Sequence, residues 1–153
     1  MTMLQLDKTQ KQILKAVNDF AKGEFKKEVV DEIVEQYSYP QEIWKKACEL
    51  GLIGMHYPEE YSGQGLGMFE NVLVTQSLCR GDSSVGTCLS MAGYGAELIL
   101  KYGTELHKKE WLPKIAEGNL LSSAAFTEPG LGNDIDQCVT TAVKSSGGYI
   151  IDG

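Results

Sequence analysis

The sequence predicts a mainly α-helical chain with a β extension: a helical domain over residues 1–118, then the beginning of an antiparallel β domain over residues 119–153. As far as about residue 117, apolar residues recur at the spacing of helices with one buried face. Beyond Gly118 the pattern changes to short β-branched runs separated by glycines and polar turns, which is typical of strands. With 153 residues and 42% hydrophobic side chains, the chain can bury a core.

Two helices and a long loop are expected in the first 68 residues. Asp7 and Gln10 form a capping-box pattern that predicts the start of the first helix. Its apolar face comprises Ile13, Leu14, Val17, Phe20 and Ala21. The second helix is expected to begin at Pro40, which suits a first helical turn, and to end at Gly51. The stretch 51–68 is rich in proline and glycine and predicts an ordered loop.

Three further helices are expected before the β region. Their predicted ranges are 68–79, 83–102 and 105–117. Asp82 or Ser83 can cap the middle helix, and Thr104 can cap the last, in which Pro113 is expected to introduce a bend before Gly118 ends it.

The middle helix is unusually rich in small residues: Gly86, Ser90, Ala92, Gly93 and Gly95. Because each glycine inside a helix costs about 1 kcal/mol relative to alanine, something must pack close to this backbone. Either another helix crosses it closely, which we favour, or a ligand lies along it.

Three short strands are expected in the β region. They are predicted over residues 120–126, 138–143 and 148–153, and the last two are joined through Ser-Ser-Gly-Gly at 145–148. A small sheet with nothing to cover it is a poor folding unit. We therefore expect the chain to be cut inside its second domain.

Composition excludes several functions. Fourteen basic and twenty-one acidic residues give a net charge of −7, which does not suit nucleic acid or an anionic membrane surface. The sequence shows neither a membrane-spanning run nor a secretory signal pattern. The four cysteines have no paired spacing and form no zinc pattern with the two histidines, so we expect free thiols, no metal site and a reducing compartment such as the cytosol.

A polar turn, AAFTEPGLGNDI at 124–135, stands out in the β region. Pro129 cannot donate a backbone hydrogen bond, and Gly130 and Gly132 can take positive φ, so several N–H groups could point the same way. Thr127 and Asn133 add polar side chains at its two ends. From these residues alone a simple turn is the commoner interpretation, and a binding turn is the alternative.

Three separated segments resemble the acyl-CoA dehydrogenase family, in the family's order. They are LGLIGMHYPEEYSGQGLG at 50–67, KYGTELHKKEWLPKIAEGN at 101–119, and FTEPGLGND at 126–134 followed by TTAVKSSGGYIIDG at 140–153. The resemblance implies the N-terminal helical domain of such an enzyme and the first strands of its central β-barrel or sandwich domain. It also implies flavin-dependent α,β-dehydrogenation of an acyl-CoA thioester, as part of a longer chain, with this fragment alone inactive.

The resemblance assigns site residues as well. FAD would contact Ala124, Ala125, Phe126, Thr127, Gly132 and Asn133. Asn133 stands where the family usually has serine, and it would also touch the CoA part of the substrate. Thr87, Ser90 and Tyr94, expected on one helical face, would border the acyl chain.

No catalytic base is expected in this chain. The resemblance places the catalytic glutamate and a C-terminal helical bundle beyond Gly153. Glu128 belongs to the cofactor turn, and Glu97 is expected to face solvent. The resemblance further implies electron transfer to an electron-transferring flavoprotein and a homotetramer. We expect a cytoplasmic location, or the mitochondrial matrix if the protein is eukaryotic.

Two hypotheses of other classes are open. A chain that ends near Gly153 would be a non-catalytic helical module that binds an acyl thioester or a partner protein. A plain helical interaction domain without a ligand would leave the segment from Thr127 to Asn133 without a purpose.

Overall fold

The computed structural model describes residues 5–153 and divides into two compact units, one up to Ser123 and one from Ala124 to Gly153. The sequence pattern changes at residue 118, but the segment up to Ser123 packs with the helices. Ser122 donates its backbone N–H to the Ala92 carbonyl at 3.0 Å and forms a single bridge with Gly93. The strand expected over 120–126 is therefore wrong, because this segment pairs at one residue only.

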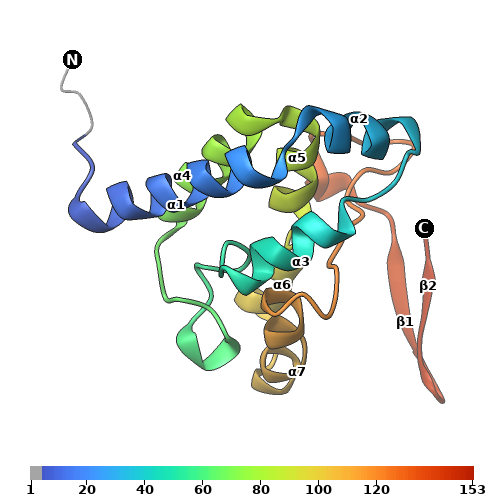
Figure 1. Ribbon diagram of the computed structural model, residues 1–153. Helices are drawn as coiled ribbons and strands as arrows, with labels where there is room; N and C mark the ends of the chain where they lie inside the picture. The colour runs from blue at the N-terminus through green and yellow to red at the C-terminus, as the bar shows by residue number, and fades with distance from the viewer. Residues whose placement is uncertain (1–4) are drawn as a thin grey trace. The chain divides into compact units, whose positions relative to one another are not determined.

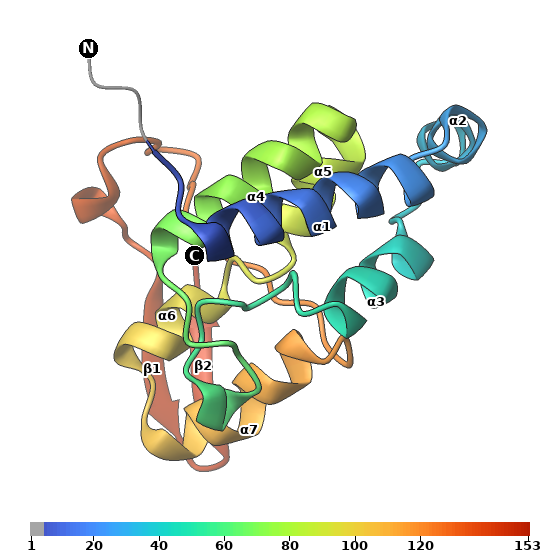
Figure 2. The ribbon, with the colours of Figure 1, turned by 60° about the vertical axis from the view of Figure 1, so that its left-hand side comes forward.

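Helices α1 (Lys8–Glu24), α4 (Met68–Gly81) and α5 (Ser83–Met91) pack together in the first unit. In both Figure 1 and Figure 2, α1 lies alongside α4. The capping box predicted at the start of α1 is confirmed: the Asp7 carboxylate accepts from the Gln10 N–H at 2.8 Å, and the Gln10 side chain accepts from the Asp7 N–H at 3.0 Å.

Helix α3 (Gln41–Glu49) follows Pro40 and is succeeded by Gly51 at φ +68°, as predicted. Helix α2 (Lys27–Glu35) is not among the helices predicted from the sequence. It buries only Val30, and its N-cap residue, Lys26, makes no side-chain capping bond. Its apolar residues Val30, Ile33 and Val34 nonetheless recur at helical spacing, so the sequence carries a periodic signal for this helix and lacks only a capping signal.

The single helix expected over 83–102 is wrong, because the chain breaks into α5 and α6 (Ala96–Tyr102). The break follows from packing of the segment before Ser123. A Cβ on Gly95 would lie 2.2 Å from the Ser123 carbonyl oxygen, so this close approach requires glycine. The Ala92 carbonyl meanwhile accepts from Ser122 instead of continuing the helix.

The glycine in α5 marks a close helix crossing. A Cβ on Gly86 would lie 2.6 Å from the backbone N of Cys79 and 2.6 Å from the carbonyl carbon of Leu78, both in α4. The favoured interpretation of the small residues, a tight crossing, is therefore confirmed at Gly86.

Asp82 is the N-cap of α5, and its replacement by alanine is expected to destabilise the protein by about 1 kcal/mol. Its carboxylate accepts from the N–H groups of Ser84 and Val85, both at 2.9 Å, and alanine leaves both donors without that partner. Asp82→Asn keeps an acceptor at this position and should remain close to wild type. Urea unfolding of the three proteins measures the difference, and equal midpoints for Asp82→Ala and wild type would contradict the assignment.

Helices α6 and α7 (Glu105–Ala116) and the 3₁₀ turn η1 (Glu59–Tyr61) surround a second core. Thr104 caps α7 as predicted, accepting from the His107 N–H at 3.3 Å, and Gly118 follows the helix at φ +76°. This core comprises Tyr57, Tyr61, Ala96, Leu112, Ile115 and Ala116, whereas the larger core lies among α1 to α5. No helix within residues 5–153 combines the length and apolar content that a membrane crossing needs.

The second unit contains the 3₁₀ turn η2 (Ile135–Gln137) and an antiparallel hairpin of β1 (Thr141–Ser145) and β2 (Gly148–Asp152). The predicted hairpin is confirmed, with Ser145 opposite Gly148 across a two-residue turn. Its first strand begins three residues later than expected, because residues 138–140 bond instead to a carboxylate in the preceding turn.

Candidate functional site

The turn at 127–133 is closed by its own backbone. Glu128 and Leu131 exchange two hydrogen bonds, at 3.2 and 3.1 Å, across Pro129 and Gly130. Neither Gly130 nor Gly132 has a positive φ, so the expectation that these glycines supply left-handed backbone is not met.

Glu128 anchors this turn to the chain that leads into β1. Its carboxylate accepts from the N–H groups of Val139 at 3.0 Å and Thr140 at 2.8 Å, from the Cys138 thiol at 2.8 Å, and from the Thr140 hydroxyl. The hydrogen bonds from Cys138 and then Thr140 lower the pKa of Glu128 to about 2. Glu128 is thus an anion that holds the turn to the segment before β1, a role that the sequence pattern does not predict.

The outer side of the turn is open. Nothing lies within 4 Å of the position that a Cβ would take on Gly130 or Gly132. Among the described residues, the N–H groups and polar side-chain atoms of Thr127 and Asn133 have no hydrogen-bond partner, and both residues are exposed. A ligand can approach a backbone closely where glycines leave no side chain in the way and where N–H groups are free to donate hydrogen bonds. These residues therefore fit a flat cofactor with hydrogen-bonding atoms along its edge.

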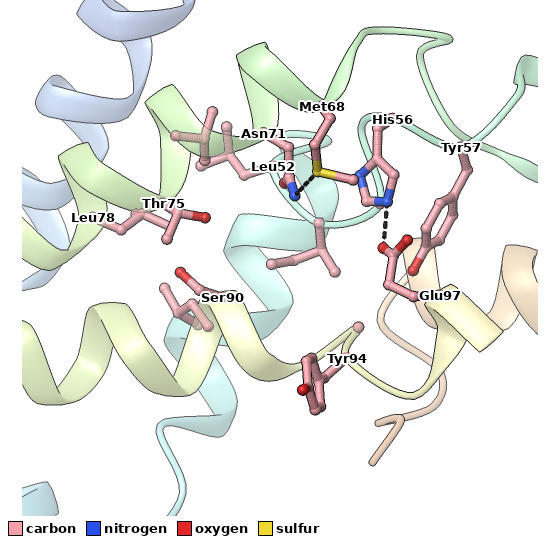
Figure 3. Close-up of a pocket in the computed structure, with 15 residues that line it drawn as sticks. Leu52, His56, Tyr57, Met68, Asn71, Thr75, Leu78, Ser90, Tyr94 and Glu97 are labelled. Carbon is pink, nitrogen blue, oxygen red and sulfur yellow. Dashed lines mark hydrogen bonds and ion pairs between the residues drawn. The ribbon is translucent and has the colours of Figure 1, made fainter. Parts of the chain in front are cut away.

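A cavity of about 190 Å³ lies in the first unit, between α4, α5 and the loop that follows α3 (Figure 3). Its floor is formed by buried apolar side chains, among them Leu52, Val74, Leu78 and Leu89. Its remaining wall is polar and includes Ser90, Tyr94, His56 and Glu97.

The structure brings two of the three predicted acyl-pocket residues to this cavity. Ser90 and Tyr94 line it, whereas Thr87 lines a separate apolar groove of about 360 Å³ together with Met91 and Leu121. The expected single helical face fails because α5 ends at Met91, which removes Tyr94 from the helical spacing. Contact of any of the three with a substrate stays a prediction.

An unexpected pair occupies one end of the cavity: the His56 Nε2 lies 2.5 Å from the Glu97 Oε1 (Figure 3). Only 9% of the His56 side chain is exposed, against 40% of the Glu97 side chain. The expectation that Glu97 faces solvent is met only in part, because its side chain is partly exposed but its carboxylate pairs with the largely buried His56 ring. No local pattern in the sequence predicts this pair, since its members are 41 positions apart.

Two polar atoms beside this pair are buried without a partner among the described residues. They are Nδ1 of His56 and the hydroxyl of Tyr57, a side chain with no exposed surface. Each such atom generally costs about 1–3 kcal/mol. Burial raises the pKa of the Tyr57 hydroxyl, and the nearby Glu97 charge adds to this, so it remains protonated.

The cysteines do not form another site. All four are free thiols, as predicted, and burial raises the pKa of the Cys48 thiol to about 12, which makes it unreactive. Within the described residues, no three histidine, cysteine, aspartate or glutamate side chains are grouped so as to hold a metal ion.

Comparison with known proteins identifies relatives over nearly the whole chain. The family model described as acyl-CoA dehydrogenase, N-terminal domain, matches residues 7–119. A (2S)-methylsuccinyl-CoA dehydrogenase of Cereibacter sphaeroides is 40% identical over 114 residues, which are 74% of this chain and 21% of the relative. An acyl-CoA dehydrogenase of Bacillus subtilis is 35% identical over 149 residues, covering 95% of this chain and 39% of the relative.

Solved structures agree with these relatives. An acyl-CoA dehydrogenase of Bacillus anthracis, complexed with FAD, superposes with a TM-score of 0.84 at 34% identity, over 100% of this chain and 26% of that one. A glutaryl-CoA dehydrogenase complexed with glutaryl-CoA gives a TM-score of 0.88 at 29% identity, over 99% of this chain and 39% of that one. The chain thus spans from about a fifth to two fifths of its relatives' length. With the family model matching most of its residues, the chain belongs to the acyl-CoA dehydrogenase family.

Proposed function

We propose that this chain supplies the N-terminal helical domain and the flavin-contacting turn of an FAD-dependent acyl-CoA dehydrogenase. The observation that carries the proposal is the open turn at 127–133, which presents bare backbone and unused donors directly after the matched helical domain. An FAD-bound structure among the relatives supports it further. Because those relatives are much longer, we propose that the chain acts within a longer polypeptide and is inactive alone.

Bound FAD would supply the acceptor for the hydride that leaves the β-carbon of the acyl group. The chain's own contribution is to hold and orient the cofactor. The backbone of 124–126 and the hydroxyl of Thr127 would hydrogen-bond the ring edge, while Gly132 and Asn133 would lie near the ribityl and pyrophosphate side. Hydrogen bonds at the ring edge set the reactivity of a flavin, and the Thr127 hydroxyl would be the principal side-chain contact there.

The substrate proposed is an acyl-CoA thioester. Ser90 and Tyr94, which line the 190 Å³ cavity, would border the acyl group, and Thr87 would border it from the adjoining apolar groove. Asn133 would reach the CoA part. The base that removes the α-proton is proposed to lie outside this chain, because the Glu128 carboxylate already accepts several hydrogen bonds and Glu97 is paired with His56.

We also propose an electron acceptor, an oligomeric state and a location for the longer protein. An electron-transferring flavoprotein is the proposed acceptor, supported by a structure from a study of that flavoprotein of Acidaminococcus fermentans, which superposes at a TM-score of 0.86 and 32% identity. An acryloyl-CoA reductase (NADH) of Anaerotignum propionicum is 32% identical over 150 residues, so the direction of the reaction needs its own assay. We further propose a homotetramer located in the cytoplasm or the mitochondrial matrix.

Gly132→Val is expected to weaken FAD binding by about tenfold, which corresponds to the loss of roughly one hydrogen bond. The added side chain fills space that is open in the chain itself, so folding should be unchanged. Gly147→Ala is the matched control, because Gly147 in the hairpin turn is equally open and is not part of the flavin turn. Titration of the apoprotein with FAD, followed by flavin fluorescence, measures the effect, and equal affinities for all three proteins would contradict this placement.

A further inference from the structure

The end of the cavity formed by His56, Tyr57 and Glu97 holds polar atoms that have no partner among the described residues. The Glu97 Oε1 accepts from the His56 Nε2–H, and Nδ1 of the same ring is buried without a partner. The other carboxylate oxygen of Glu97 has no partner among the described residues. The Tyr57 hydroxyl is likewise buried without a partner among the described residues, so the free oxygen of Glu97 is the exposed acceptor of this cluster.

The charge at this end of the cavity is negative or neutral. None of the described residues that line the cavity is lysine or arginine, so within this lining the partner of the Glu97 carboxylate is His56. The buried floor offers only apolar surface, formed by Leu52, Val74 and Leu89. A group that enters therefore meets an apolar wall along its length and a carboxylate at one end (Figure 3).

The volume of the cavity limits what can enter. About 190 Å³ holds a short acyl segment and cannot hold a CoA moiety. Ser90, Tyr94 and Glu97 follow one another along the chain and all line the same space. Because the CoA moiety stays outside, the part of an acyl group that enters is the end remote from its thioester, and Glu97 is among the polar groups that this end meets.

We propose that Glu97, oriented by His56, selects acyl groups whose remote end carries a hydrogen-bond donor, either a hydroxyl or an amine. This inference rests on the proposed acyl-CoA function and adds a substrate class to it. A donor satisfies the free carboxylate oxygen, whereas a methyl end leaves it unpaired and a carboxylate end places two like charges together. Sites that hydrogen-bond a substrate group discriminate strongly against analogues that lack it.

The test uses the full-length holoprotein and a matched series of acyl-CoA thioesters of one chain length, ending in methyl, hydroxyl, ammonium or carboxylate. Dissociation constants are measured from the perturbation of the flavin spectrum or by calorimetry. We expect the wild type to bind the hydroxyl- or ammonium-ended thioester at least about tenfold more tightly than the methyl-ended one, and the carboxylate-ended one most weakly. This comparison needs no substitution, so it does not depend on the folding of a variant.

Glu97→Gln then tests the residue. It should raise the relative affinity for the carboxylate-ended thioester by at least about tenfold and lower that for the ammonium-ended one. Glu110→Gln, an exposed acidic position on α7, is the matched control and should leave every ratio unchanged. A wild type that prefers the methyl end, or ratios that Glu97→Gln does not alter, would overturn the proposal while acyl-CoA binding itself stands. Failure to bind any thioester would instead remove the proposed function as well.

Discussion

Gly86→Ala is expected to destabilise the helical unit by about 2–3 kcal/mol, the usual result of forcing atoms into a closely packed site. The new Cβ would lie 2.6 Å from backbone atoms of Leu78 and Cys79, and backbone cannot move aside as a flexible side chain can. Helices α4 and α5 would have to separate. Alanine gains about 1 kcal/mol in helix propensity, which offsets only part of this loss.

Gly23→Ala in α1 is the matched control, since nothing lies within 4 Å of the added methyl group. It should leave stability unchanged or raise it by up to about 1 kcal/mol. Urea unfolding of both variants measures the contrast. If Gly86→Ala were as stable as Gly23→Ala, the close crossing of α4 and α5 would be refuted.

Glu128→Gln is expected to weaken flavin binding by about 10–100-fold, the loss that removal of a hydrogen bond to a charged group generally produces. The glutamine side chain offers a single acceptor and places an NH₂ group among the donors of Cys138, Val139 and Thr140. The turn then loses its attachment to the segment before β1. Asp136→Asn, an exposed acidic residue of the same unit, is the control and should bind flavin as the wild type does.

The contribution of the Glu128 carboxylate to the stability of the turn depends on pH, and the sign of this dependence follows from its pKa. The hydrogen bonds from Cys138 and Thr140 lower the pKa of Glu128 from 4.5 to about 2. Because the folded pKa lies below the unfolded one, the anion stabilises the turn fully above pH 4.5 and loses this effect as pH falls towards 2. The difference in melting temperature between wild type and Glu128→Gln should thus be constant above pH 4.5 and shrink below it. A difference that disappears near neutral pH would contradict this role of the carboxylate.

Local signals in the sequence predict local structure correctly. The Asp7–Gln10 box, Pro40 and Thr104 each act within a few residues, and all three mark helix starts that the structure confirms. The resemblance of separated segments likewise identifies the family without any knowledge of packing.

Features that depend on distant contacts could not be predicted. The break after Met91 results from the approach of Ser123 to Gly95, and the strand expected at 120–126 finds a partner only at Gly93. Pairing of His56 with Glu97 needs the fold to bring a loop and a helix together. No periodicity or motif records such contacts, because each involves single residues far apart in the chain.

Anaerobic mixing of the purified full-length protein with a panel of acyl-CoA thioesters, while flavin absorption is followed, would test the proposed dehydrogenase most directly. We expect FAD to be released from the denatured protein and its visible absorption to bleach with at least one acyl-CoA in the native protein. A protein that neither contains nor binds FAD, or a bound flavin that no acyl-CoA reduces, would contradict the proposal.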